Sequence, residues 1–308
     1  MTTTSLGQRI DKRIIKKADH DGWLYLALRL VEARRILSAP VSYFNNRRKA
    51  RSIVDASRWS DFIPKEDGFR PFLIDTFAEL PDVISACEDI YAQYEADLNS
   101  GKKYNKPFFY NIMDEESLKS HPILLDFALS EAITEAATGY LGHIPRLNSI
   151  GVFLSPVNDT ISGSQKFHSD GDCLKQVKLF VNIWEVAPGG GGFTFIPKSK
   201  TNEFLRKSGL NYNLSDEDVA KFIPDSEQIV ANGPPGSGLL CDTSGCLHMG
   251  SRARKMPRLI LKIQFVSRPD ALLPRPIGRT AHGGHVMVTK KLLENFDIKN
   301  PNAGLYVD

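Results

Sequence analysis

The residues best suited to chemistry are His168 and Asp170, which stand two positions apart in the stretch Phe167-His-Ser-Asp. Side chains two positions apart on a β-strand share one face, so the imidazole and the carboxylate can point at the same object. A second histidine, His248, follows eighty residues later in Cys246-Leu-His-Met-Gly. Two histidines and one carboxylate are the smallest ligand set for a non-haem Fe(II) site with open positions. The sequence therefore predicts an iron site at His168, Asp170 and His248.

An arginine follows this candidate ligand set. Arg258 comes after Pro257 at the start of an apolar-polar alternating run, where its planar guanidinium can hold a carboxylate by two hydrogen bonds. Arg252 and Arg254 compete for this role, and we prefer Arg258 because the alternation puts it on the polar face of its strand.

Two further alternatives remain open at this point. Asp172 stands on the same predicted strand face as Asp170 and is a second candidate for the carboxylate ligand. His282 and His285 form a weaker metal candidate, and a Gly-rich surface loop is the simpler interpretation of that stretch.

The elements that must position these residues change in character near Arg146. Before it, the spacing of apolar residues predicts helices over 8–38, with a break near 19–22, and over 80–98 and 122–140, whereas 40–70 is expected to be a connector. After it, short strands separated by Pro or Gly clusters are expected at 147–154, 166–170, 177–186, 192–197, 227–231, 238–242 and 258–266. Helices followed by many short strands predict an α+β fold with a jelly roll or double-sheet barrel carrying helices on one side.

Two of these strands have faces of opposite character. Lys178, Phe180, Asn182 and Trp184 alternate with purely aliphatic residues, and Arg258, Lys262 and Gln264 do the same in the last strand. The aliphatic faces are expected to pack on helices or on the other sheet, and the polar faces are expected to line a cavity. Polar side chains inside a barrel need partners, and a ligand is a natural one.

The chain is expected to comprise a basic helical extension at 1–60 and a single domain at 61–308, with a barrel core at about 146–267. The extension carries 13 Lys/Arg against 5 Asp/Glu, which indicates either a solvated helical segment or a docking surface for an acidic partner. An insertion at 199–226, with Ser215 as the N-cap of a short helix, is expected either to cover the site as a lid or to be a surface connection.

Composition sets the remaining expectations. The net charge of +3 over 308 residues does not favour a nucleic-acid partner, and none is expected. Four cysteines without CxxC spacing, no signal-peptide pattern and no sufficiently apolar run favour a cytoplasmic protein without a membrane span.

Taken together, four motifs resemble those of the phytanoyl-CoA dioxygenase family over roughly residues 120–267. They are Ser164-Gln-Lys-Phe-His-Ser-Asp-Gly-Asp, Lys178-Leu-Phe-Val-Asn-Ile-Trp-Glu-Val, Gly191-Gly-Phe-Thr-Phe-Ile-Pro-Lys-Ser, and Cys246-Leu-His-Met-Gly with Pro257-Arg258. The resemblance implies a double-stranded β-helix and an Fe(II)- and 2-oxoglutarate-dependent oxygenase that consumes O₂. The chain departs from the family where Lys198-Ser-Lys replaces the usual Gly-Ser-His.

Carried over by position, the resemblance implies that His168, Asp170 and His248 hold the iron and that Arg258 pairs with the distal carboxylate of 2-oxoglutarate. Phe180 and Asn182 fall where that family lines the cosubstrate pocket. The presence of Asp170 implies hydroxylation, desaturation or rearrangement rather than halogenation, because halogenases of this kind carry a small residue there.

The expected reaction is hydroxylation of a C–H bond in a small organic molecule, with release of succinate and CO₂. Lys178, Lys262 and the basic N-terminal segment weakly favour an anionic or carrier-linked substrate. The rival interpretations are a cupin-like hydrolase or isomerase that uses another divalent metal, and a ligand-binding barrel without catalysis. Arg258 argues against both rivals, because neither needs a carboxylate clamp.

Overall fold

The computed structural model describes residues 24–98, 108–171, 173–208, 214–267, 286, 288 and 290–307. Asp172, His282, His285 and the first half of the expected 8–38 helices lie outside the described residues. The described helices are α2 (Leu24–Ser38), α3 (Pro40–Ala56), α4 (Leu80–Leu98), α5 (Glu115–Ser120), α6 (Ile123–Ala128), α7 (Glu131–Leu141), α8 (Lys198–Ser208), α9 (Asp216–Ala220) and α10 (Lys290–Leu293).

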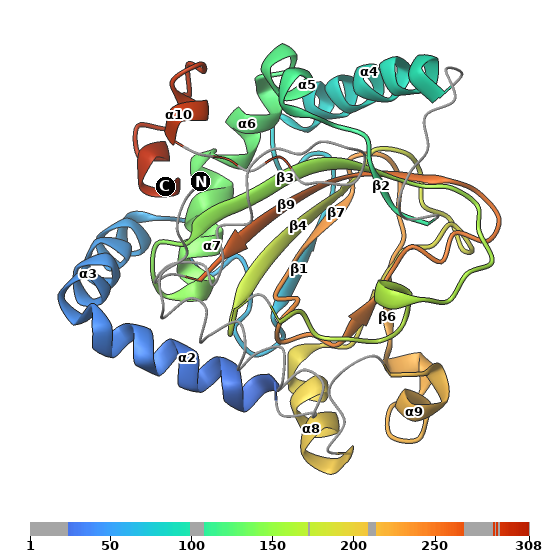
Figure 1. Ribbon diagram of the computed structural model, residues 1–308, viewed down its shortest axis with the longest axis horizontal. Helices are drawn as coiled ribbons and strands as arrows, with labels where there is room; N and C mark the ends of the chain where they lie inside the picture. The colour runs from blue at the N-terminus through green and yellow to red at the C-terminus, as the bar shows by residue number, and fades with distance from the viewer. Residues whose placement is uncertain are drawn as a thin grey trace.

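The strands form two antiparallel sheets (Figure 1). The larger has the order β1-β7-β4-β9-β3-β2, built from β1 (Phe69–Phe72), β2 (Tyr110–Asn111), β3 (Arg146–Ser155), β4 (Gln176–Asn182), β7 (Gly238–Cys241) and β9 (Arg258–Val266). The smaller has the order β6-β5-β8, built from β5 (Phe193–Phe195), β6 (Ile229–Ala231) and β8 (His248–Met249). This arrangement is consistent with the predicted jelly roll.

The two faces of the large sheet differ as the alternation predicts. Leu179 of β4 and Leu261 and Ile263 of β9 belong to a fully buried cluster that also contains Leu124 and Phe127 of α6. Alternate residues of a strand point to opposite faces, so the aliphatic face of the sheet packs on the helices. Fully burying each such side chain stabilises the fold by roughly 1.5–3 kcal/mol, which explains why this face is uniformly apolar.

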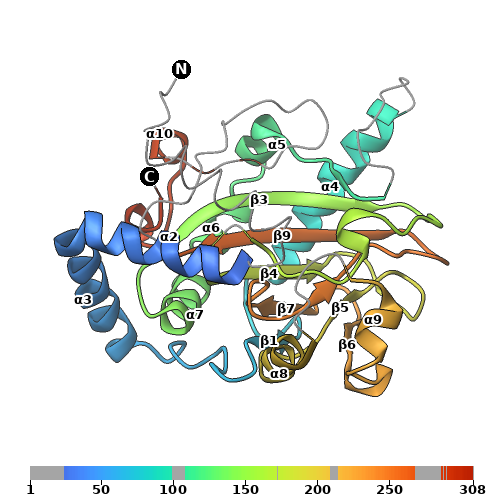
Figure 2. The same cartoon turned by 60° about the horizontal axis from the view of Figure 1, so that its bottom comes forward.

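The other face of the large sheet meets the small sheet. Phe180 and Ile260 share a second buried cluster with Phe193 and Phe195 of β5, and Phe153 of β3 also belongs to it. Trp184 departs from the expectation for this face, because β4 ends at Asn182 and Trp184 packs on the helix side, with ring centroids 4.7 Å from Tyr91 of α4. Figure 2 shows β5 and β6 lying on one side of the large sheet.

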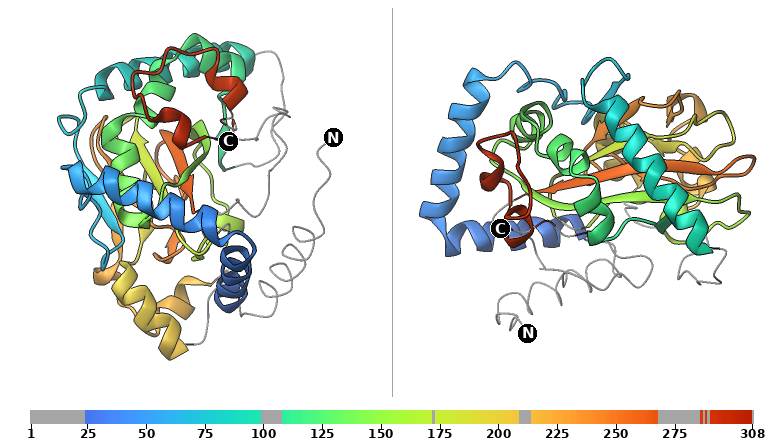
Figure 3. Two further views of the ribbon diagram at one scale, coloured as in Figure 1. Left: turned by 90° about the vertical axis from the view of Figure 1, so that its left-hand side faces the viewer. Right: turned by 90° about the horizontal axis from the view of Figure 1, so that it is seen from above.

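Two helical expectations are wrong in detail. Residues 40–56 form helix α3 rather than a connector, because Pro40 occupies the first turn, where its missing N–H costs nothing. The single helix expected at 122–140 is two helices, α6 and α7, separated at Leu129 and Ser130. Figure 3 shows α2 and α3 as an angled pair at the edge of the molecule.

The insertion contains two helices, where the sequence predicted one. Ser215 caps α9 as expected, since its hydroxyl accepts a hydrogen bond from the Asp218 backbone N–H at 3.1 Å. Helix α8 was not predicted. Phe204 of α8 and Val219 of α9 belong to a buried cluster with Phe167 and Leu247, the residues that precede His168 and His248. The insertion therefore packs behind the two histidine-bearing segments, and its role as a lid stays a prediction.

Within the described part of the chain, no helix combines the length and the apolar character needed to cross a membrane.

Candidate metal centre

His168 and His248 are brought together by the backbone. Each donates its main-chain N–H to the carbonyl oxygen of the other at 2.9 Å, forming a β-bridge that extends the small sheet beyond β8. Residues opposite each other in such a bridge project to the same face, so both imidazoles point into the space between the sheets. Their ring centroids lie 4.3 Å apart.

Both imidazoles are held in the form that a metal requires. Nδ1 of His168 lies 2.8 Å from the Lys166 carbonyl oxygen, and Nδ1 of His248 lies 2.9 Å from the Cys246 carbonyl oxygen. A carbonyl only accepts hydrogen bonds, so each Nδ1 carries a proton, and Nε2 is the nitrogen of each ring that faces the other members of the group. Backbone carbonyls that orient metal-binding histidines in this way are a regular feature of metal sites.

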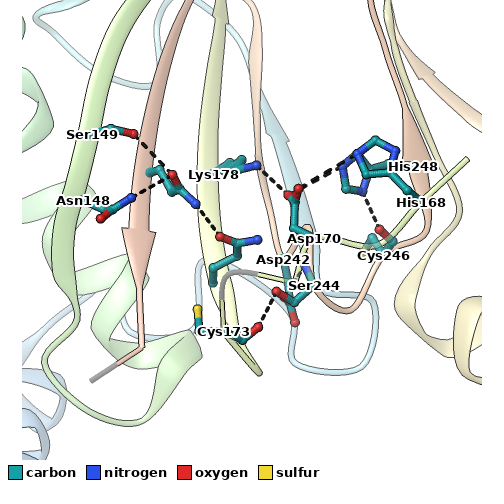
Figure 4. Close-up of polar contacts among 12 residues, drawn as sticks. Asn148, Ser149, His168, Asp170, Cys173, Lys178, Asp242, Ser244, Cys246 and His248 are labelled. Carbon is teal, nitrogen blue, oxygen red and sulfur yellow. Dashed lines mark hydrogen bonds and ion pairs between the residues drawn. The ribbon is translucent and has the colours of Figure 1, made fainter. Parts of the chain in front are cut away.

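Asp170 completes the group from the loop after His168 (Figure 4). Its carboxylate oxygens lie 4.0 Å from Nε2 of His168 and 3.6 Å from Nε2 of His248. The Asp170 main-chain N–H donates to the Thr243 carbonyl oxygen at 2.9 Å, and Lys178 Nζ of β4 lies 2.5 Å from Oδ2. The loop is thus fixed at its backbone and at its side chain.

The electrostatics suit a metal ligand set. Burial on its own would raise the pKa of the Asp170 carboxyl, but Lys178 and the two histidines outweigh burial and lower it, so Asp170 is ionised. Burial lowers the pKa of His248 to about 3, with His168 adding to the effect and Asp170 opposing it. His248 is therefore a neutral imidazole at physiological pH, which is the ligating form.

The donor set fits a divalent transition metal. One ligand atom from each of His168, Asp170 and His248 lies within 4.8 Å of the others, and no second group of this kind occurs among the residues the structure describes. Two imidazole nitrogens and one carboxylate oxygen are the facial triad typical of non-haem Fe(II) oxygenases, and they leave further coordination positions open.

Arg258 lies at one end of the space between the sheets. It is the first residue of β9, is 4% exposed, and donates from Nη1 to the Gly191 carbonyl oxygen at 2.6 Å. Its Nε is buried without a hydrogen-bond partner. Burial lowers the pKa of Arg258 to about 10, and no acidic side chain contributes to that shift. A buried cation with an unused donor is the arrangement expected of a site built for a carboxylate.

A cavity of about 190 Å³ lies directly against Arg258. Phe180 and Asn182 line it together with Phe193 and Ile260, and their role toward a cosubstrate stays a prediction. Phe193 was not singled out from the sequence, yet its ring centroid lies 4.6 Å from Phe180 and 5.1 Å from His248. Most of the lining residues are apolar, and Arg258 adds a charged side chain to them.

The two competing arginines are bound elsewhere. Arg252 forms a two-point ion pair with Asp216 of α9 at 2.7 and 2.9 Å. Arg254 donates to the Asn158 carbonyl oxygen at 2.6 Å and lies 3.5 Å from Asp159. These contacts favour Arg258 for the carboxylate role. Lys178, which the sequence connected with an anionic substrate, has Asp170 as its partner. The sequence placed Lys178 on the polar face of β4, but it did not indicate that Asp170 would be its partner.

No protein-family model matches this chain, and a search of curated proteins finds no relative. Among solved structures, the chain is similar to SnoN, a non-heme alpha ketoglutarate-dependent epimerase from nogalamycin biosynthesis, at 14% identity and a TM-score of 0.45 over 78% of this chain and 97% of that one. It is similar to EctD from S. alaskensis, crystallised with 2-oxoglutarate and 5-hydroxyectoine, at 16% identity and a TM-score of 0.45 over 71% and 84%. It is also similar to the non-heme monooxygenase ThoJ at 14% identity and a TM-score of 0.48 over 75% and 84%. None of these three is named as a phytanoyl-CoA dioxygenase.

Proposed function

We propose that this chain is an Fe(II)- and 2-oxoglutarate-dependent oxygenase, with His168, Asp170 and His248 as the metal ligands. The observation that carries the proposal is the convergence of the three donor atoms within 4.8 Å, with both histidine Nδ1 atoms already engaged by carbonyls. Two neutral nitrogens and one anionic oxygen suit Fe(II) and leave room for a chelating keto acid and O₂.

Arg258 is proposed to hold the distal carboxylate of 2-oxoglutarate. Its guanidinium is buried with an Nε that has no hydrogen-bond partner, and Arg258 lines the same cavity as Phe180 and Asn182. Most of the lining residues are apolar, and a less polar surrounding strengthens a charge-assisted hydrogen bond between the guanidinium and a carboxylate. A hydrolase or a simple binding barrel needs no such cation, so this residue favours the oxygenase over both rivals.

When bound, iron and 2-oxoglutarate would supply activation of O₂ for oxidation of a substrate C–H bond, with release of succinate and CO₂. The protein's own contribution is positional. The β-bridge sets the spacing of the two imidazoles, and Lys178 holds one oxygen of Asp170 in place. Hydroxylation of a small organic substrate within a phytanoyl-CoA dioxygenase-like double-stranded β-helix is the specific form that we propose.

The test is anaerobic addition of Fe(II) and 2-oxoglutarate to the metal-free full-length chain. A weak visible charge-transfer band, typical of chelated keto acid on iron, is expected with the wild type and is expected to weaken in His168→Ala and Arg258→Ala. Arg252→Ala is the matched control, because that arginine pairs with Asp216 on α9. Absence of the band in the wild type, or equal loss in Arg252→Ala, contradicts the proposal.

A further inference from the structure

The turn between β7 and β8 touches both segments that carry the proposed ligands. The Thr243 carbonyl oxygen accepts the main-chain N–H of Asp170 at 2.9 Å, and the Cys246 carbonyl oxygen holds Nδ1 of His248 at 2.9 Å. Ser244 Oγ also donates to the Cys173 carbonyl oxygen at 2.9 Å, just after the Asp170 loop. A shift of this turn would therefore move Asp170 and His248 relative to each other.

Asp242 fixes the conformation of the turn from within. Its Oδ1 accepts the main-chain N–H groups of Ser244 at 3.2 Å and of Gly245 at 3.0 Å. Its main-chain carbonyl accepts those of Gly245 at 3.0 Å and of Cys246 at 2.8 Å. A Cβ atom on Gly245 would lie 2.6 Å from Asp242 Oδ2, so the turn closes tightly on the carboxylate.

The other oxygen of Asp242 is held by two side chains from distant helices. Oδ2 accepts from Tyr140 of α7 at 2.6 Å and from Lys198, the first residue of α8, at 3.2 Å. Lys198 Nζ also donates to Tyr140 Oη at 2.7 Å. Asp242 is 1% exposed, and a carboxylate buried this deeply is tolerated only when it is paired and hydrogen-bonded. Burial and Asp242 raise the pKa of Tyr140, so its hydroxyl stays protonated and donates.

We infer that Asp242, anchored by Tyr140 and Lys198, is a positioning residue for the metal site, acting through the 242–246 turn on Asp170 and His248. The inference rests on the proposed function, because it assumes that these two residues bind metal. It also accounts for Lys198, which stands in the Lys-Ser-Lys stretch where the resembled family has Gly-Ser-His. Groups that orient metal ligands typically change metal affinity by roughly 10–100-fold when they are removed.

The first test is a titration of the metal-free full-length protein with Co(II), followed by the visible d–d spectrum. Asp242→Asn keeps the shape of the side chain but replaces one acceptor oxygen with an NH₂ donor. In one orientation this donor faces Tyr140 and Lys198, and in the other it faces the N–H groups of the turn. Co(II) affinity is expected to fall by about tenfold or more, with an altered spectrum. Lys198→Met, which keeps the apolar stem, is expected to act in the same direction.

The double variant Asp242→Asn/Lys198→Met is expected to lose less affinity than the sum of the single variants, because the two residues act as one unit. Gly245→Ala, which crowds the carboxylate, is expected to weaken Co(II) binding without touching any ligand. Lys207→Met is the matched control, since Lys207 of α8 pairs with Glu203 at the surface. Its affinity and spectrum are expected to equal those of the wild type.

Hydrogen exchange of the metal-free protein supplies a readout that does not depend on metal. Exchange across residues 240–250 is expected to quicken in Asp242→Asn and Lys198→Met, and to stay unchanged in Lys207→Met. If Asp242→Asn does not fold, the Co(II) affinities of Lys198→Met and Gly245→Ala test the inference instead. Folded variants that bind Co(II) with wild-type affinity and spectrum overturn the inference, even where their melting temperature is lower.

The inference and the proposed function fail in different ways. If His168→Ala binds Co(II) as the wild type does, the proposed metal site is wrong. If His168→Ala loses Co(II) while Lys198→Met, Gly245→Ala and any folded Asp242→Asn keep it, the metal site stands and only the positioning role is refuted.

Discussion

Replacing Arg258 by methionine is expected to weaken cosubstrate binding and, at the same time, to stabilise the metal-free protein. Methionine fills a similar volume without charge. Burial lowers the pKa of Arg258 from its ordinary value to about 10, which corresponds to a penalty of about 3 kcal/mol for the charged form in the folded state. Replacing Arg258 by methionine removes this penalty, but it also removes the hydrogen bond to the Gly191 carbonyl oxygen, which costs about 1–2 kcal/mol. The free energy of unfolding of Arg258→Met should therefore rise by about 1–2 kcal/mol.

The effect on 2-oxoglutarate has the opposite sign. Removing one partner of a buried charged pair costs roughly 2–5 kcal/mol, which is about 30-fold or more in Kd. Calorimetric titration of 2-oxoglutarate into the Mn(II)-loaded protein measures this loss, and urea unfolding of the metal-free protein measures stability. Arg252→Met is the control, with unchanged 2-oxoglutarate affinity expected because Arg252 pairs with Asp216. An Arg258→Met variant that is less stable than the wild type, with unchanged affinity, would refute the reasoning.

Three further predictions concern the ligand, the N-terminal helices and the core. Asp170→Ala should abolish substrate-coupled succinate formation, because it removes one proposed ligand and leaves Lys178 buried without its ionic partner. Succinate yields equal to those of the wild type would show that Asp170 is not a ligand. Deleting residues 1–38 should spare Co(II) binding, because α2 supplies none of the three candidate ligands; loss of binding in a folded deletion variant would contradict this. Gly139→Ala should lower the melting temperature by several degrees, because its Cβ would lie 2.0 Å from the Ser60 carbonyl oxygen; an unchanged temperature would show that the contact relaxes freely.

The sequence predicted best where one alternation decides the structure. In β9, the alternate residues Leu259, Leu261, Ile263 and Phe265 lie against the helices, and Arg258 lies on the opposite face, as period-two spacing requires. The same rule misplaced Trp184, because nothing in the apolar pattern marks Asn182 as the end of β4. The expectation of a connector from residue 40 onward was wrong because it treated Pro40 as a helix breaker, whereas a proline can also begin a helix.

The convergence of His168, Asp170 and His248 was predictable from the sequence, whereas the side chains that support them were not. His168 and Asp170 are neighbours in sequence, and their spacing carries information. Tyr140, Lys198 and Asp242 meet from three distant segments, and no local pattern connects them before the chain has folded. Their polar character was visible, but which buried cation faces which buried anion is decided by tertiary structure alone.

The packing of α8 and α9 behind the histidine segments has a consequence for protein engineering. Phe167 and Leu247 are immediate neighbours of His168 and His248, and their rings and branches rest on these two helices. Repacking the insertion would therefore disturb the candidate metal centre through the two segments that carry its histidines. Libraries that aim to change selectivity should leave this layer intact and diversify positions that do not contact it.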